Sequence, residues 1–264
     1  MVVKMNNVVK RYNELIALDH FNMEVVEGEI LGLLGPNGCG KTTAISCILS
    51  LIRFSKGEIE VFGQRMTPNS YDIKKKIGLV PQDVSVFDNL NVQENVDYFC
   101  GLYVDDKKTR QKYVAQALEF VGLMDYIKFY PKKLSGGLKR RLNIACGIAH
   151  KPELIFLDEP TIGVDPQSRN FMLEGIKELN RQGSTIIYTT HYLDEAEMLC
   201  RRIIIMDNGK DLVTGTTEEL KKMITTSEII VVTFPLISEE LIGQLKTLPR
   251  VIDIEKNDEE YTIK

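Results

Sequence analysis

The stretch that decides the fold is Ile30-Leu31-Gly32-Leu33-Leu34-Gly35-Pro36-Asn37-Gly38-Cys39-Gly40-Lys41-Thr42-Thr43. Its opening part, Ile30 to Leu34, is almost wholly apolar, which is typical of a strand buried on both faces of a mainly parallel sheet. The part from Gly35 to Thr42 matches the pattern G-x-x-x-x-G-K-[ST], and residues 42–51 are predicted to form a helix. A buried strand, a glycine-rich loop and a helix in this order predict a phosphate-binding loop in an α/β fold.

The chemistry of phosphate binding explains the residue types in this loop. Glycines let successive backbone N–H groups face one anion, and the following helix adds the positive end of its dipole. Lys41 is expected to reach the β- and γ-phosphates of a nucleotide, and the Thr42 hydroxyl can ligate Mg²⁺. We therefore predict nucleotide contacts from Gly35, Pro36, Asn37, Gly38, Cys39, Gly40, Lys41, Thr42 and Thr43.

A second buried strand is predicted to carry acidic residues to the same region. The apolar run 154–157 ends in Asp158-Glu159-Pro160. An aspartate at the tip of such a strand suits a Mg²⁺ ligand, either direct or through water. Side chains alternate along an extended chain, so Glu159 is expected to point elsewhere and to polarise a water. A phosphate loop alone is compatible with kinases, GTPases, helicases and transporters. This acidic pair reduces the number of protein classes that fit the sequence.

Composition and charge limit the classes of partner and compartment. The chain has 264 residues, of which 44% are apolar, and a formal net charge of -4, which argues against nucleic acid as the main partner. Its five cysteines form no C-x-x-C pair, so neither a zinc site nor a disulfide framework is indicated. No stretch approaches the roughly 20 apolar residues that cross a bilayer, and the opening residues lack the apolar core of a signal peptide. We expect reduced thiols and a cytoplasmic location.

Alternating strand and helix patterns predict a layered domain. Further apolar runs lie at 184–190 and 203–206, and helical patterns lie at 107–121, 168–181 and 193–199. This alternation is typical of a parallel sheet covered by helices. At the start of the chain, Val2-Val3 and Val8-Val9 are predicted to be short strands on either side of a turn at Asn6-Asn7. Residues 82–151 carry no buried-strand pattern and are predicted to be a helical insert.

The pattern changes after about residue 225. A strand is predicted at 228–234, a helix at 238–246, and strands at 251–254 and 261–263. We therefore expect one domain over 1–225 and a small α+β extension over 226–264. The chain stops inside or just after a predicted strand, so an incomplete unit is one interpretation of this extension. About 40 residues are too few for a secure core of their own.

The segment Leu134-Ser135-Gly136-Gly137, with Lys139-Arg140-Arg141 just after it, resembles the signature sequence of ABC ATPases. The resemblance covers about residues 3–215. The other motifs of the family are also present, in the order that the family has. They are Tyr12, the phosphate loop, Gln82 after Val80-Pro81, the signature, Asp158-Glu159-Pro160, Gly163-Val164-Asp165-Pro166, and His191 after Thr189-Thr190. Leu138 departs from the family, which commonly has glutamine there, and puts the fine tuning of the signature in doubt.

The resemblance implies a fold and a dimer. The fold is the P-loop NTPase layered fold of ABC ATPase type, with a mainly parallel core sheet, an N-terminal antiparallel β part, a helical insert and a small α+β C-terminal tail. Two such domains close head-to-tail around ATP and Mg²⁺. Residues that would contact the partner's nucleotide in trans are Ser135, Gly136, Gly137 and Asp165.

The resemblance also implies roles within one chain. Glu159 would orient or deprotonate the attacking water, and His191 would hold the γ-phosphate and the water in line. Gln82 would touch the metal or the water, so Thr42, Gln82 and Asp158 are the expected metal ligands. Tyr12 would stack on adenine. Taken singly, Gln82 could be a surface residue, His191 a structural histidine, and Tyr12 a residue that packs on a β-hairpin.

These expectations lead to a function. The resemblance is strongest to the exporter branch with ABC-2 type partners, so the chain is expected to bind and hydrolyse ATP and to power transport. Separate membrane-spanning permease subunits would carry the cargo, and the second ATPase would be another copy or a paralogue. The chain would lie peripherally on the cytoplasmic face of the membrane. The alternatives are a soluble non-transport ABC ATPase of translation or DNA repair and a nucleotide switch that no longer hydrolyses.

Overall fold

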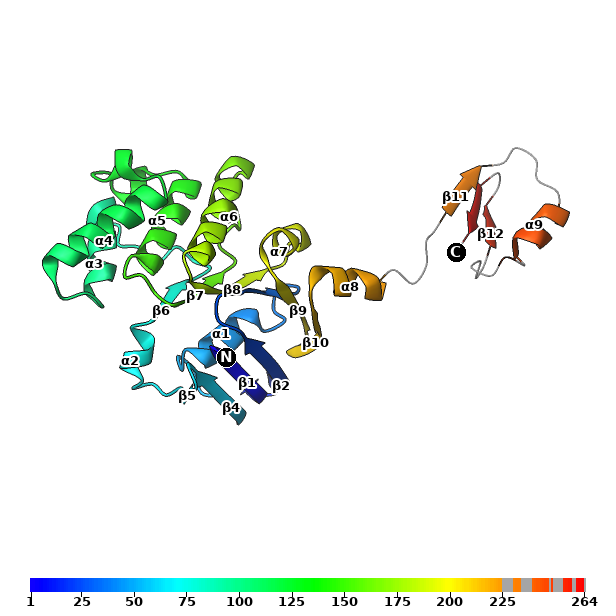
Figure 1. The fold of residues 1–264 in the computed structure, drawn as a ribbon, viewed down its shortest axis with the longest axis horizontal. Helices are drawn as coiled ribbons and strands as arrows, with labels where there is room; N and C mark the ends of the chain where they lie inside the picture. The colour runs from blue at the N-terminus through cyan, green and yellow to red at the C-terminus, as the bar shows by residue number, and fades with distance from the viewer. Residues whose placement is uncertain (225–229, 234–238, 247, 249–253, 258–259, 264) are drawn as a thin grey trace. The chain divides into compact units, whose positions relative to one another are not determined.

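The computed structural model describes residues 1–224, 230–233, 239–246, 248, 254–257 and 260–263 (Figure 1). The chain divides into two compact units, Met1–Thr217 and Glu218–Lys264. The boundary between them falls inside the first turn of helix α8 (Thr217–Ile224). The sequence prediction put it at 225/226, after that helix.

A six-stranded sheet forms the centre of the first unit, in the order β10-β9-β3-β8-β7-β6. Neighbouring strands are parallel except for the antiparallel β9–β10 pair at one edge. Every residue of β7 and of β8 is buried. The apolar run of β7 fits a strand covered on both faces, and in β8 three threonines are buried beside two isoleucines and a tyrosine. The strands are β3 (Ile30–Leu34), β6 (Ile77–Val80), β7 (Leu154–Asp158), β8 (Thr185–Thr190), β9 (Arg202–Asp207) and β10 (Lys210–Gly215). The predicted mainly parallel core sheet is confirmed.

A second, antiparallel sheet has the order β2-β1-β4-β5. Its strands are β1 (Val3–Tyr12), β2 (Leu15–Val25), β4 (Lys56–Val61) and β5 (Gln64–Arg65). The prediction of a turn at Asn6-Asn7 was wrong, because β1 runs through both residues with a register shift between Met5 and Val8. Asn7 has a φ of 50°, so one residue in the left-handed region absorbs the irregularity as a β-bulge.

The segment between β6 and β7 is helical and contains no strand, as predicted for the insert over 82–151. Its elements are α3 (Val92–Gly101), α4 (Lys107–Phe120), the short helices η1 (Met124–Tyr126) and η2 (Pro131–Lys133), and α5 (Gly136–Ile148). The side chains of Asn91, Asp106 and Ser135 cap α3, α4 and α5 by accepting from backbone N–H groups in the first turn. Figure 1 shows α3, α4 and α5 grouped on one side of the unit and β1, β2 and β4 on the other.

The remaining helices of the first unit are α1 (Lys41–Ile48), α2 (Tyr71–Lys74), α6 (Pro166–Arg181) and α7 (Leu193–Leu199). Of these, α6 and α7 connect strands of the central sheet, whereas α1 lies between β3 and β4 and α2 between β5 and β6. Helix α1 follows β3 through the glycine-rich loop, and α6 and α7 flank β8 in the chain. The carboxyl ends of β3, β7 and β8 therefore all lead into segments that the sequence marked for chemistry.

The second unit has its own antiparallel sheet, in the order β11-β13-β12. Its elements beyond α8 are β11 (Ile230–Thr233), α9 (Glu239–Lys246), β12 (Ile254–Asn257) and β13 (Glu260–Ile263). The order strand, helix, strand, strand agrees with the predicted α+β tail, although residues 228–229, 234, 238 and 251–253 of those predictions lie outside the described residues. Among the helices that the structure describes, none is both long and apolar enough to span a bilayer.

Candidate nucleotide site

The phosphate loop turns sharply between β3 and α1. Gly40 is the N-cap of α1 and has a φ of 113°, in the left-handed region that favours glycine. A Cβ atom at Gly40 would lie 2.5 Å from the backbone oxygen of Ala17 on β2, so the antiparallel sheet closes one side of the loop. The loop therefore packs directly against β2 where it enters the helix. A glycine-rich loop that leads into a helix N-terminus is the arrangement that binds phosphate in other proteins.

Lys41 is buried at the start of α1. Its Nζ donates to the backbone oxygens of Gly35, at 2.8 Å, and Pro36, at 3.0 Å. The same Nζ lies 3.2 Å from Oε1 of Glu159, and both side chains are almost completely buried. The ammonium is thus held over the loop, with a carboxylate as its anionic neighbour.

Asp158 joins the loop to β7 and β8. Its Oδ2 accepts from Thr42 Oγ1 at 2.7 Å, and its Oδ1 accepts from Thr189 Oγ1 at 2.5 Å. Hard oxygen donors of this kind suit Mg²⁺, which commonly takes one or two protein oxygens and completes its shell with phosphate and water. No group of three or more histidine, cysteine or acidic residues within the described ranges could hold a metal alone. The Thr42–Asp158 pair therefore fits a magnesium that is shared with a nucleotide.

Glu159 follows the strand rather than continuing it. Its φ is 46°, and its backbone N–H donates to Oγ1 of Thr189 at 2.9 Å. The reason that we gave from the sequence, alternation along an extended chain, was wrong, because the chain turns into the left-handed region at this residue. Such a conformation is costly for a residue with a side chain and persists where its surroundings enforce it.

His191 completes the cluster from the end of β8. Its Nδ1 lies 3.0 Å from Oε2 of Glu159, whose other oxygen faces Lys41. The imidazole is partly exposed and lies 4.0 Å from the ring of Tyr192, centroid to centroid. The structure therefore brings together five predicted residues at the carboxyl ends of β3, β7 and β8, and we call them the phosphate-side cluster: Lys41, Thr42, Asp158, Glu159 and His191.

Gln82 and Tyr12 do not join this cluster. Gln82 lies two residues beyond β6 with an exposed side chain, and none of the hydrogen bonds described for this chain connects that side chain to the cluster. Tyr12 lies at the end of β1 and is 45% exposed. The Nζ of Lys10 lies 4.4 Å from the centroid of its ring, so one aromatic face already has a cation beside it.

The signature residues form a second group, which includes Asp165. Ser135 is the N-cap of α5, and its Oγ accepts from the N–H of Leu138 at 3.3 Å. Asp165 is the N-cap of α6 and accepts from Ser168 N at 2.9 Å, and this N–H lowers the pKa of its carboxyl. A Cβ atom at Gly137 would lie 3.3 Å from Oδ2 of Asp165, so the two helix N-termini are neighbours. We call Ser135, Gly136, Gly137 and Asp165 the signature-side group.

Two residues of α5 to which the sequence assigned no role hold the loop that follows β6 and contains Gln82. Arg140, on α5, is buried and donates from Nη1 to the backbone oxygens of Gln82 and Pro81. Asn143 donates to the same Pro81 oxygen at 3.1 Å and accepts from Ser85 N at 3.0 Å. The helix that starts at the signature is thus bonded directly to the Gln82 loop. The run Lys139-Arg140-Arg141 gave no sign of this, because charge runs usually lie on solvated faces.

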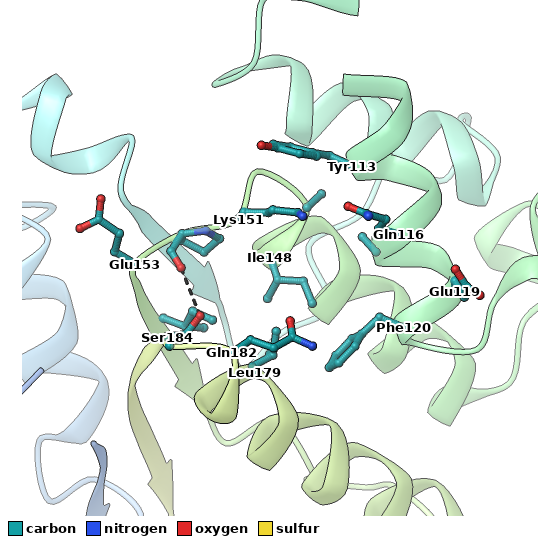
Figure 2. Close-up of a pocket in the computed structure, with 15 residues that line it drawn as sticks. Tyr113, Gln116, Glu119, Phe120, Ile148, Lys151, Glu153, Leu179, Gln182 and Ser184 are labelled. Carbon is teal, nitrogen blue, oxygen red and sulfur yellow. Dashed lines mark hydrogen bonds between the residues drawn. The ribbon is translucent and has the colours of Figure 1, made fainter. Parts of the chain in front are cut away.

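A cavity of about 630 Å³ lies elsewhere in the first unit, beside the amino ends of β7 and β8 (Figure 2). In Figure 2, Tyr113 and Phe120 of α4 and Gln182 lie around it, together with Lys151. The Nζ of Lys151 lies 4.6 Å from the centroid of the Tyr113 ring. No residue of the phosphate-side cluster lines this cavity.

Comparison with known proteins shows which family this chain resembles. The family model of the ABC transporter matches residues 18–162. The linearmycin resistance ATP-binding protein of Bacillus subtilis is 38% identical over 262 residues, which cover 99% of this chain and 84% of that protein. The Nod factor export ATP-binding protein I of Burkholderia orbicola is 36% identical over 222 residues, 83% of this chain and 72% of that protein.

Solved structures give the same result for the fold. An ATP-binding cassette solved as a dimer in a post-hydrolysis state, bound to ADP and Pi, has a TM-score of 0.74 and 28% identity. That match covers 81% of this chain and 98% of the other. An ATP-binding subunit of an ABC transporter has a TM-score of 0.78 at 23% identity and covers 94% of this chain, which supports the fold alone.

Proposed function

The chain belongs to the ABC transporter family, and from this premise we propose that it binds and hydrolyses ATP to power export through separate membrane-spanning subunits. The observation that carries the proposal is the phosphate-side cluster, in which a lysine, a hydroxyl–carboxylate pair, a glutamate and a histidine meet at one edge of the sheet. The names of the relatives, which include resistance and export proteins, support the exporter direction.

Different residues of the phosphate-side cluster can take different roles in phosphoryl transfer to water. The ammonium of Lys41 lies 3.2 Å from the carboxylate of Glu159. A phosphate bound in the loop would replace Glu159 as the anionic partner of Lys41. The exchange leaves the carboxylate of Glu159 to orient and deprotonate the attacking water. Thr42 and Asp158 would hold Mg²⁺, which neutralises charge on the β- and γ-phosphates when it is bound.

His191 would act beside Glu159 in this reaction. Its Nδ1 contacts Oε2 of Glu159 at 3.0 Å, so the histidine fixes the direction of the carboxylate and presents its other nitrogen outward. A γ-phosphate held by that ring would stay in line with the water. Gln82, two residues beyond β6, would approach the metal or the water once the site is filled.

The signature-side group would serve the second nucleotide of a dimer. Ser135 and the N–H groups of Gly136 and Gly137 lie at the N-terminus of α5, which favours an anion. In a head-to-tail dimer they would face the γ-phosphate held by the other subunit, and Asp165 would lie at the seam. The partner is a second copy or a paralogous ATPase, and the pair would work at the cytoplasmic face of the membrane beneath permease subunits.

The test is Mg²⁺-dependent ATP hydrolysis by the purified chain and its Glu159→Gln variant. We expect hydrolysis by the variant to fall by about 10²- to 10⁴-fold, because the general base is lost. ATP should still raise its melting temperature, and an ATP-bound dimer should accumulate in size-exclusion chromatography. Lys41→Ala is the control, since it should lose the ATP-dependent stabilisation as well.

Two outcomes would overturn the proposal. A wild-type chain that does not bind Mg·ATP cannot be the ATPase subunit, and a Glu159→Gln variant that hydrolyses at the wild-type rate would remove Glu159 from the role of base. Co-purification with membrane subunits tests the transport part separately. Hydrolysis that is stimulated by ribosomes or DNA, with no membrane partner, would favour the soluble alternative.

A further inference from the structure

A completely buried carboxylate lies behind the phosphate-side cluster. The side chain of Glu195, on α7, has no solvent exposure. Its Oε1 lies 2.7 Å from Oγ1 of Thr161 and 2.7 Å from Nε of Arg169. Its Oε2 accepts from Oη of Tyr188 at 2.7 Å and from Oγ1 of Thr190 at 2.8 Å. Both oxygens are thus engaged by two partners each.

The partners of Glu195 come from the segments that carry the reacting groups. Thr190 directly precedes His191, and its Oγ1 also accepts from the N–H of Tyr192 at 3.0 Å. Thr161 lies two residues after Glu159 and four before Asp165, and it is buried. One carboxylate therefore ties the turn at His191 to the loop that runs from Glu159 to the signature-side group.

Arg169 extends the connection to helix α6. Its guanidinium lies 2.5 Å from a carboxylate oxygen of Asp194 and 5.2 Å from the centroid of the Tyr192 ring. Arg169 lies in the first turn of α6, the helix that Asp165 caps. The arginine therefore contacts the segment beyond His191 from the helix that carries Asp165.

We propose that Glu195 is a positioning residue, which holds the His191 turn and the Glu159–Asp165 loop in one fixed relation. The inference rests on the proposed ATPase function. Three hydroxyl groups donate hydrogen bonds to this buried carboxylate, and Arg169 adds an ion pair. Such charge-assisted contacts are strong, and a half-satisfied network of this kind would be costly. Loss of one link should shift the turn and the loop relative to each other, and displacements of about 1 Å reduce catalysis strongly.

The test separates positioning from simple stabilisation of the fold. Thr161→Val cuts the link to the loop, and Thr190→Val cuts the link to the His191 turn, while both keep the side-chain shape. Thr185→Val is the matched control, because Thr185 is a buried threonine on the same strand as Thr190, and its Oγ1 accepts from Gly28 N at 2.9 Å. It lies at the other end of β8, away from the cluster.

We expect Thr161→Val and Thr190→Val each to lower kcat by about tenfold while the KM for ATP stays within about twofold, because geometry is lost and nucleotide contacts are not. Thr185→Val should leave kcat unchanged at a similar loss of melting temperature. In a Glu195→Leu background, Thr161→Val should lower kcat no further, because leucine accepts no hydrogen bond and the link is already broken. Equal kcat losses in Thr161→Val and Thr185→Val would overturn the inference.

A second measurement does not depend on hydrolysis. The chain has three histidines, so the ring resonances of His191 can be followed by NMR with His20 and His150 as internal references. Thr161→Val should shift the His191 resonances and leave the other two in place, and Thr185→Val should shift none. If the wild-type chain does not hydrolyse ATP, the proposed function fails and this shift alone decides the inference. An unmoved His191 signal in Thr161→Val would overturn it.

Discussion

His150 shows how burial of a single residue can make stability depend on pH. Its Nε2 lies 3.0 Å from the backbone oxygen of Ile77, and its ring stacks on Tyr103 at 4.2 Å between centroids. Its Nδ1 is buried without a partner among the described residues. Burial lowers the pKa of this imidazole, and the bond to Ile77 offsets that effect only in part. The folded chain therefore disfavours the imidazolium form.

The sign of the pH dependence follows from this pKa. Below about pH 6.5, the ordinary pKa of histidine, the unfolded chain binds a proton at His150 that the folded chain still excludes, so stability falls as pH falls. We expect the loss of unfolding free energy between pH 7.5 and pH 5.5 to be smaller in His150→Gln than in the wild type. Urea denaturation at the two pH values measures it. Parallel losses in both proteins would contradict the assignment to His150.

The residue scale also shows what the sequence could predict about the site. Lys41, Asp158 and Glu159 could be predicted because each lies at or beyond the end of a buried strand within a recognisable motif. Arg140 and Glu195 could not, since each lies in a polar run that resembles a solvated helix face. The burial of Glu195 depends on Thr161, Arg169, Tyr188 and Thr190, which come from other elements of the fold.

At the scale of elements, the existence and order of helices and strands could be predicted, but their close contacts could not. The predicted helix 193–199 coincides with α7, and 107–121 differs from α4 by one residue at its end. In β1 the pattern of Asn6-Asn7 suggested a turn, whereas pairing with β2 on one side and β4 on the other keeps the strand continuous. Tertiary pairing thus overrides a local turn signal.

Helices α5 and α6 offer a matched test of close packing. A Cβ atom at Gly147, on α5, would lie 2.7 Å from Cγ2 of Val80 and 2.9 Å from the backbone oxygen of Leu79, so α5 rests directly on β6. A Cβ atom at Gly175, on α6, would meet only the ring of Phe120, at 3.4 Å. Both glycines are inside helices, where alanine is intrinsically better by about 0.5–1 kcal/mol.

We therefore expect the same substitution to have opposite effects in the two helices. Gly175→Ala should raise the free energy of unfolding by about 0.5–1 kcal/mol. Gly147→Ala should lower it by about 1–3 kcal/mol, because backbone and a packed valine must move. Chemical denaturation of both variants measures the difference. A stabilised Gly147→Ala would show that α5 can move away from β6 at little cost.

At the scale of the whole molecule, the two groups of site residues are separate within one chain. No hydrogen bond or ion pair described here joins the phosphate-side cluster to the signature-side group, although Glu195 connects the segments that carry them. The sequence could identify both groups by their motifs. Motifs do not show whether two groups act on one nucleotide within a chain or across a dimer, because that depends on how copies pair.

Mixing two inactive variants decides between these arrangements. Lys41→Ala removes the lysine of the phosphate-side cluster, and Ser135→Arg blocks the exposed N-cap of α5. In a mixed head-to-tail dimer, one site combines both defects, while the other combines the intact loop of one chain with the intact signature of the other. Random pairing at equal amounts should therefore restore about a quarter of the wild-type ATPase rate, since half of the dimers are mixed and each has one sound site.

The control for this mixture joins two defects from the same group. Lys41→Ala mixed with Glu159→Gln should restore nothing, because each site of the mixed dimer takes Lys41 and Glu159 from one chain, as their 3.2 Å contact requires. Steady-state ATPase assays across mixing ratios measure both pairs, with the first pair reaching its maximum at equal amounts. A rate that stays at background for Lys41→Ala with Ser135→Arg at every ratio would mean that each chain completes its own site. The signature-side group would then have to reach the phosphate loop of the same chain, through a rearrangement of α5 relative to the central sheet.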